Sequence, residues 1–209
     1  MKEFWNTEIT EASWQGLQAL RRKMDFLLIG GWAAYIYSRL QKSRDVDIVV
    51  DYDALSSLSK EYQLIKNERL RKYEVKMSKY DIDIYVPNYS VLTIPPGDLI
   101  TKYRTEVEGF SLPTPEALLA LKLGAALDRK GSIKGEKDAV DILGLLFYAG
   151  LDMARLRAVL SKYRLSHGID LMISLLNGFD RSALAYLNLN ENSFSKLKHS
   201  YLPELKKIR

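Results

Sequence analysis

The sequence contains no cysteine and only two histidines, His167 and His199. The lack of cysteine excludes disulfides and thiolate metal sites. Two histidines are too few for the usual zinc centres built from imidazole, and neither has an acid at catalytic spacing. If the chain binds a metal ion, we therefore expect carboxylates to be its ligands.

Long apolar runs are also absent. No stretch is long enough to span a bilayer, and the first residues, MKEFWNTEITEASW, lack the apolar core of a signal peptide. We therefore expect a cytoplasmic protein with no membrane partner. Repeats and low-complexity segments are missing too, and 209 residues suffice for one substantial domain or two small ones. A net charge of +5 is compatible with polyanionic partners.

The most informative stretch is FLLIGGWAAYIYSRLQKSRDVDIVVDY, which begins at Phe26. The apolar run Phe26–Ile29 predicts a buried strand, and Gly30 and Gly31 separate it from a helical pattern over Trp32–Leu40. A strand–glycine–helix turn exposes backbone N–H groups at a helix N-terminus, where they bind phosphate. An ordinary tight turn would also explain the glycine pair, so its meaning depends on the residues beyond the helix.

Two acids, Asp45 and Asp47, open the next strand in the sequence Asp-Val-Asp-Ile-Val-Val. Strand side chains alternate between faces, so both carboxylates are expected on one side of the sheet. Asp is depleted from strands, and the flanking apolar residues indicate burial, where a charge needs a partner. Divalent cations with a preference for oxygen ligands meet that need. We therefore favour a metal site over a solvated strand edge.

A third acid is expected from a hairpin with arms Tyr73–Met77 and Tyr80–Val86. Its second arm carries Asp81 and Asp83 on one face, and pairing would bring them beside the strand of Asp45. Asp83 lies deeper in the arm and is favoured, with Asp81 in reserve. Elsewhere in this half, the pattern predicts a helix from Asp53 to Lys66 and a short edge strand over Thr105–Leu112.

The order glycine pair, helix, Asp-x-Asp and later acid resembles the DNA polymerase β-type nucleotidyltransferase superfamily. Within it, GGWAA…R…SRDVDIVV is most similar to the AbiEii-type toxins and to the aminoglycoside and lincosamide nucleotidyltransferases. Many members have Ser or Thr directly after the first or second glycine, where this chain has Trp32. The resemblance implies an α+β fold: a nucleotidyltransferase-type mixed β-sheet flanked by helices and followed by a C-terminal helical bundle.

The resemblance also implies a reaction, the transfer of a nucleotidyl group from an NTP such as ATP to an acceptor hydroxyl. Asp45, Asp47 and Asp83 would be catalytic and would bind one or two Mg²⁺ ions. The backbone of Gly30-Gly31 would bind phosphates. Arg44 is expected either to pair with the acids or to contact the triphosphate.

From Thr114 onward the pattern changes to helices, beginning with a helix that starts at Pro115 and extends to Lys130. A second helix is expected at Glu136–Tyr148, and helical patterns continue to the end of the chain. We therefore expect a nucleotidyltransferase α/β domain at 1–113 and a helical domain at 114–209.

The helical half contains a second constellation. Lys122 lies in an otherwise apolar helix, where a lysine needs an anion. Lys137 and Asp138 come about one helical turn before Asp141. In the AbiEii-type arrangement that this resembles, Lys122, Lys137 and Asp138 would contact the nucleotide and Asp141 would join the catalytic network. An ion pair from Lys122 to Asp138 or Asp141 that only stabilises the bundle is an equal alternative.

The acceptor is left open by the sequence. One hypothesis is an AbiEii-like toxin that modifies an RNA, such as the 3′ end of tRNA, and has a cognate antitoxin protein as partner. A second is a small-molecule transferase of the antibiotic-modifying kind. A third is a catalytically inactive nucleotide-binding regulatory protein.

Overall fold

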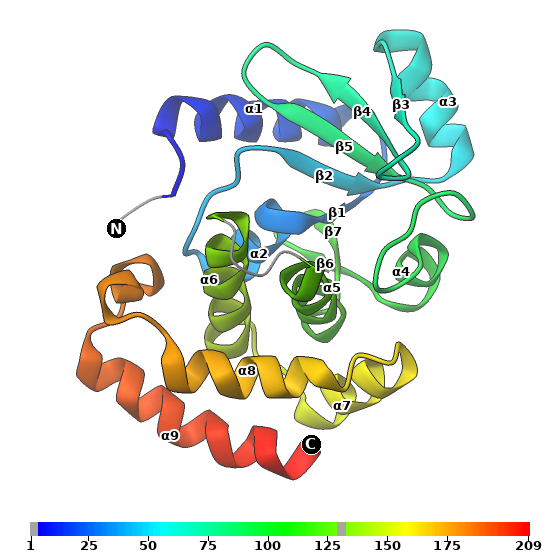
Figure 1. Ribbon diagram of the computed structural model, residues 1–209. Coiled ribbons are helices and arrows are strands. Elements are labelled where there is room, and N and C mark those ends of the chain that lie inside the picture. The colour runs from blue at the N-terminus through cyan, green and yellow to red at the C-terminus, as the bar shows by residue number, and fades with distance from the viewer. Residues whose placement is uncertain (1–3, 129–132) are drawn as a thin grey trace.

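The computed structural model describes residues 4–128 and 133–209. Its centre is a five-stranded sheet with strand order β1-β2-β5-β4-β3 (Figure 1). The pair β2–β5 is parallel and the other pairs are antiparallel, so the sheet is mixed. The strands are β1 (Leu27–Ile29), β2 (Val46–Val49), β3 (Ile65–Asn67), β4 (Lys72–Lys76) and β5 (Asp81–Tyr85).

The hairpin predicted from the alternating pattern is confirmed as β4–β5, and its second arm pairs with the strand that carries Asp47. The central strands are short and apolar, and their buried side chains belong to one hydrophobic cluster. The front-half helices are α1 (Thr7–Lys23), α2 (Gly30–Ser38), α3 (Tyr52–Glu61) and α4 (Pro96–Lys102).

Two local predictions in the front half are wrong. The helix expected to continue to Lys66 ends at Glu61, because Ile65 and its neighbours form β3 on the edge of the sheet. Sheet pairing there overrides the helical periodicity. The single strand expected over Thr105–Leu112 is a two-stranded hairpin, β6 (Arg104–Val107) and β7 (Phe110–Pro113). Glu108 and Gly109 turn the chain, both with positive φ, as in two-residue hairpin turns.

The back half is helical, as predicted, and Figure 1 shows α8 and α9 as the layer furthest from the sheet. Its elements are α5 (Pro115–Asp128), α6 (Ile133–Tyr148), α7 (Met153–Lys162), α8 (His167–Gly178), the 3₁₀ helix η1 (Arg181–Leu187) and α9 (Glu191–Ile208). The last two residues of the helix predicted to reach Lys130 lie outside the described residues.

Helices α5 and α6 pack against each other and against α2, the helix that follows the glycine pair. The buried side chains of α2, α5 and α6 belong to the same hydrophobic cluster as those of the sheet. The α+β class is therefore confirmed, while the predicted boundary at residue 113 stays a prediction. Among the described helices, none has the length and apolar character that crossing a membrane requires.

Candidate active site

The glycine pair forms the first turn of α2, directly after β1. Gly30 has φ +69, and a Cβ at this position would lie 2.1 Å from Oδ2 of Asp47. The cause is the antiparallel register of β1 and β2, which sets Ile29 opposite Asp47. Only glycine combines this backbone conformation with room for the carboxylate.

Gly31 is approached by two donors from distant parts of the chain. A Cβ on Gly31 would lie 2.5 Å from Oγ of Ser43 and 3.2 Å from Nζ of Lys137. The Ser43 hydroxyl thus lies in the space that a side chain at position 31 would need. A hydroxyl, an ammonium group and a helix N-terminus are all groups that bind phosphate, so this turn is a candidate phosphate site.

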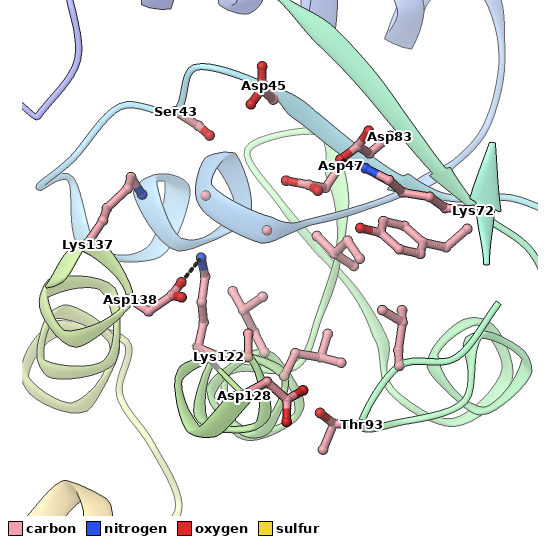
Figure 2. Close-up of a pocket in the computed structure, with 18 of the residues that line it drawn as sticks. Ser43, Asp45, Asp47, Lys72, Asp83, Thr93, Lys122, Asp128, Lys137 and Asp138 are labelled. Carbon is pink, nitrogen blue, oxygen red and sulfur yellow. Dashed lines mark hydrogen bonds and ion pairs between the residues drawn. The ribbon is translucent and has the colours of Figure 1, made fainter. Parts of the chain in front are cut away.

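The expected acids lie along two neighbouring strands. Asp47 is directly opposite Asp83 in the parallel pair β2–β5, and Figure 2 shows the two carboxylates beside each other. Asp45 comes just before β2, and its Oδ1 accepts a hydrogen bond of 3.3 Å from the backbone N–H of Asp81. Asp83 lines the central cavity with Asp45 and Asp47, whereas the side chain of Asp81 is not part of its wall.

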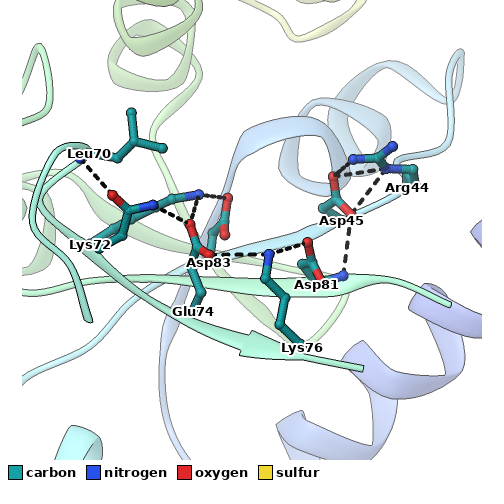
Figure 3. A network of polar contacts seen from close by, with 9 residues as sticks. Arg44, Asp45, Leu70, Lys72, Glu74, Lys76, Asp81 and Asp83 are labelled. Carbon is teal, nitrogen blue, oxygen red and sulfur yellow. Dashed lines mark hydrogen bonds and ion pairs between the residues drawn. The ribbon is translucent and has the colours of Figure 1, made fainter. Parts of the chain in front are cut away.

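Ion pairs surround these acids, as Figure 3 shows. Asp45 pairs with Arg44 at 3.0 Å, and Asp83 pairs with Lys72 at 2.6 Å. Burial raises the pKa of Asp83, and the ion pair with Lys72 opposes that rise. Arg44 therefore contacts an acid, the first of the two roles expected for it, and also lines the cavity.

Asp47 differs from the other acids because it forms no ion pair within the described part of the chain. Burial, followed by the nearby charge of Asp83, raises the pKa of Asp47 to about 7. A buried carboxylate beside a second one is stabilised by an added cation, so the donor chemistry of Asp45 and Asp47 fits Mg²⁺. Over residues 4–128 and 133–209, no three acidic or imidazole side chains are arranged to share one ion.

The second constellation is a buried cluster between α5 and α6. Lys122 lies 2.7 Å from Asp141 and 3.5 Å from Asp138, and Lys137 lies 2.8 Å from Asp141. Burial opposes the charge on Asp141, but the two lysines outweigh it and lower its pKa. Burial lowers the pKa of Lys137, whereas the acids raise that of Lys122 despite burial. The interhelical ion pair considered from the sequence is therefore present.

The position of this cluster also bears on function. Lys122, Lys137 and Asp138 line the cavity, while Asp141 lies behind the lysines and is not part of the wall. Figure 2 shows Lys122 directed from α5 toward the start of α2. Asp141 can thus act on a ligand only through Lys122 and Lys137.

The glycine turn, Asp45, Asp47, Asp83 and the two lysines line a cavity of about 540 Å³, which is a typical size for a small-molecule site. One part of the wall is polar and contains the glycine turn, the acids and the lysines. Another part is apolar, and its members are Trp5, Leu70, Val91, Leu92, Leu118 and Leu121. The cavity therefore offers polar groups for a charged phosphate chain and apolar side chains for a ring.

Sequence reasoning missed two of the wall residues, Ser43 and Lys72. Both carried a signal in the alternation of strand residues: Ser43 precedes Asp45 and Asp47 in steps of two, and Lys72 begins the alternating run Lys-Tyr-Glu-Val-Lys. Alternation alone does not show that Ser43 approaches Gly31 or that Lys72 pairs with Asp83, because each partner lies on another segment of the chain.

Comparisons with known proteins agree on the fold. No family model matches the chain, and no curated protein matches its sequence. The crystal structure of JHP933 from Helicobacter pylori has a TM-score of 0.54 at 17% identity and covers 98% of this chain and 95% of its own. The crystal structure of ANT(2″)-Ia in complex with adenylyl-2″-tobramycin has a TM-score of 0.52 at 14% identity, with coverages of 76% and 98%. The nucleotidyltransferase fold expected from the sequence is confirmed, and the closer likeness to AbiEii-type toxins stays a prediction.

Proposed function

We propose that this chain is a nucleotidyltransferase, which joins the NMP part of an NTP to an acceptor hydroxyl and releases pyrophosphate. The observation that carries the proposal is the contact between Asp47 and the glycine turn, which sets a buried acid beside a candidate phosphate site in one cavity. The fold agrees, because ANT(2″)-Ia, which has the same fold, was crystallised with an adenylylated compound.

The residues of the polar wall would bind the phosphates. Gly30 and Gly31 line the cavity at the N-terminus of α2, where backbone N–H groups have no partner within the helix. The hydroxyl of Ser43 and the ammonium of Lys137 lie against the same turn. Lys122 adds a second ammonium from α5. These donors hold the triphosphate and orient its α-phosphorus toward the acids.

Asp45 and Asp47 would hold Mg²⁺. When bound, a divalent ion neutralises the triphosphate and stabilises charge on the attacking and leaving oxygens. The two aspartates would keep that positive charge beside β2, where the α-phosphate is expected to bind. For Asp45 this role means exchanging its contact with Arg44, which is then available to the phosphates.

Asp83 is the residue that we assign to proton transfer. It lies opposite Asp47 on the cavity wall, and burial gives its carboxylate a raised pKa, which favours acceptance of a proton. The acceptor oxygen forms a bond to the α-phosphorus as its proton passes to Asp83, and the bond to pyrophosphate breaks.

RNA, for example the 3′ end of a tRNA, is the acceptor we propose. Leu70 lines the cavity, and its neighbours in the sequence, Arg69 and Arg71, are exposed and carry positive charge. Such charges bind the backbone of a nucleic acid. The alternative is a small-molecule acceptor, which the fold of ANT(2″)-Ia favours.

The test uses NTPs radiolabelled at the α-phosphate, incubated with Mg²⁺ and either total tRNA or tobramycin. Label in tRNA supports the RNA acceptor, and label in tobramycin supports the small molecule. Asp47→Asn abolishes either signal, whereas Asp53→Asn, an exposed acid on α3, retains it. Mg²⁺-dependent NTP binding without transfer to either acceptor would favour the catalytically inactive nucleotide-binding regulatory protein, and absence of both transfer and binding would overturn the proposed nucleotidyl transfer.

A toxin role, with a cognate antitoxin protein as partner, extends this proposal. Expression of the active chain is expected to arrest growth, and Asp47→Ala is expected to remove the arrest. Normal growth with fully active protein would argue against the toxin role but not against nucleotidyl transfer.

A further inference from the structure

Lys72 begins β4 and reaches across to β5. Its Nζ lies 2.6 Å from Oδ2 of Asp83 and 3.1 Å from Oε1 of Glu74, and Glu74 is directly opposite Asp83 in the register of the two strands. Lys72 is only 9% exposed and lines the same cavity as Asp47 and Asp83. A buried cation therefore already contacts the third acid of the site (Figure 3).

Glu74 has other partners besides Lys72. It also pairs with Lys76 at 3.2 Å and accepts a hydrogen bond of 2.9 Å from Asn67. Asp83, by contrast, has Lys72 as its one ion-pair partner within residues 4–128 and 133–209. The acid that requires Lys72 is thus the one in the candidate active site.

We propose that Lys72 supplies the positive charge beside Asp83 that a second divalent ion would otherwise supply, so that the nucleotide binds with a single Mg²⁺. This inference rests on the proposed nucleotidyl transfer and specifies how its site is charged. A divalent ion on Asp83 would meet the ammonium that already contacts that carboxylate, and like charges repel strongly in a buried site. In the part of the chain that the structure describes, no three acidic or imidazole side chains are arranged to share an ion. This agrees with a site that binds one ion and not two.

Lys72 also acts as a positioning residue for the proposed proton acceptor. Its ion pair engages Oδ2 of Asp83, which fixes the carboxylate and leaves Oδ1 for the acceptor hydroxyl. In this proposal, Asp45 and Asp47 bind the ion that accompanies the nucleotide, and Asp83, positioned by Lys72, accepts the proton of the acceptor hydroxyl.

The experiment counts bound Mn²⁺, a paramagnetic substitute for Mg²⁺. The whole chain is dialysed to equilibrium against Mn²⁺ with the non-hydrolysable α,β-methylene analogues of ATP, CTP, GTP and UTP in turn. Protein-bound Mn²⁺ per bound nucleotide is measured, and electron paramagnetic resonance reports whether two ions lie close enough to couple. The variants are Lys72→Met and, as matched control, Lys76→Met, which removes a lysine that contacts Glu74 and Asp81 but not Asp83.

The expected result is one uncoupled Mn²⁺ per nucleotide in the wild type and in Lys76→Met, and two coupled ions in Lys72→Met. Two ions in the wild type would overturn the role of Lys72 while leaving nucleotidyl transfer intact. A single Mn²⁺ per nucleotide in folded Lys72→Met would also overturn the role of Lys72 and leave nucleotidyl transfer intact. No binding of Mn²⁺ and nucleotide to any variant would overturn the proposed function itself. The wild-type count decides the matter if Lys72→Met does not fold.

Discussion

Oδ2 of Asp47 lies 2.1 Å from the position that a Cβ on Gly30 would take. Gly30 begins α2 directly after β1, Asp47 lies on β2, and the antiparallel register of β1 with β2 brings the two residues together. The proposed phosphate-binding turn and the buried acid are therefore in direct contact, so we expect a change in one to displace the other.

Gly30→Ala tests this unit. Alanine at φ +69 costs about 1–2 kcal/mol in backbone strain, and its Cβ also displaces Asp47. We expect at least a ~100-fold loss in kcat/KM, in line with the effect of misplacing a reacting group. The control is Gly150→Ala, where φ is +67 but a Cβ would meet nothing within 4 Å. It should lower the melting temperature and leave activity per folded molecule unchanged; equal loss of activity in both variants would contradict the account.

Asp47→Asn is expected to stabilise the metal-free protein while abolishing transfer. The folded-state pKa of Asp47 is raised from 3.8 to about 7, so the folded chain binds more protons than the unfolded chain in this range. Its contribution to the free energy of unfolding therefore falls as pH rises from about 4 to about 7. The melting temperature of Asp47→Asn in EDTA should exceed that of the wild type by roughly 5–10 °C above this range, and the gap should close below it.

Mg²⁺ provides the complementary measurement for the same variant. Adding Mg²⁺ and NTP should raise the melting temperature of the wild type, since a ligand that binds only the folded state stabilises it. The same addition should leave the melting temperature of Asp47→Asn unchanged. A gap between the two proteins that does not vary with pH, or Mg²⁺ stabilisation of both, would contradict the role of Asp47.

Ser43→Ala should lower kcat/KM by about tenfold, the effect of losing one hydrogen bond to a charged phosphate. The control Ser56→Ala removes an exposed hydroxyl on α3 and should be neutral. The double variant Gly31→Ser/Ser43→Gly supplies the hydroxyl from the other side of the contact, because a Cβ on Gly31 would lie 2.5 Å from Oγ of Ser43. It should recover most of the lost activity. Failure of this exchange, with a normal melting temperature, would exclude Ser43 from phosphate binding.

Lys122→Met separates the two roles considered for the buried cluster. Asp141 retains Lys137 as a partner in this variant, so the fold should survive with a reduced melting temperature. If Lys122 binds phosphate, KM for the NTP should rise by about tenfold or more. If the lysine only joins α5 to α6, kinetics per folded molecule will equal those of the wild type.

Much of the site could be predicted from the sequence because its main signals are local. Gly30-Gly31, a helix and Asp45-x-Asp47 follow one another within one short stretch, and strand alternation is enough to predict that both carboxylates lie on one face. Asp83 could be favoured over Asp81 because its apolar neighbours indicate a deeper place in the sheet. These inferences need only periodicity and the chemistry of buried carboxylates.

The remaining features depend on contacts between distant segments. The partner of Lys72 is set by the register of β4 with β5, and Ser43 meets Gly31 through the path of the loop between α2 and β2. Ile65 belongs to a strand because β4 pairs with it, although its spacing fits a helix. Register and loop path are tertiary properties, so no local pattern specifies them.

The most direct test of nucleotidyl transfer compares two labelled forms of the same NTP with wild-type chain, Mg²⁺ and acceptor. Label on the α-phosphate should appear in the acceptor, and label on the γ-phosphate should appear only in pyrophosphate, with both signals lost in Asp47→Asn. Transfer of the γ-label to the acceptor, or release of pyrophosphate that Asp47→Asn does not abolish, would contradict the central claim.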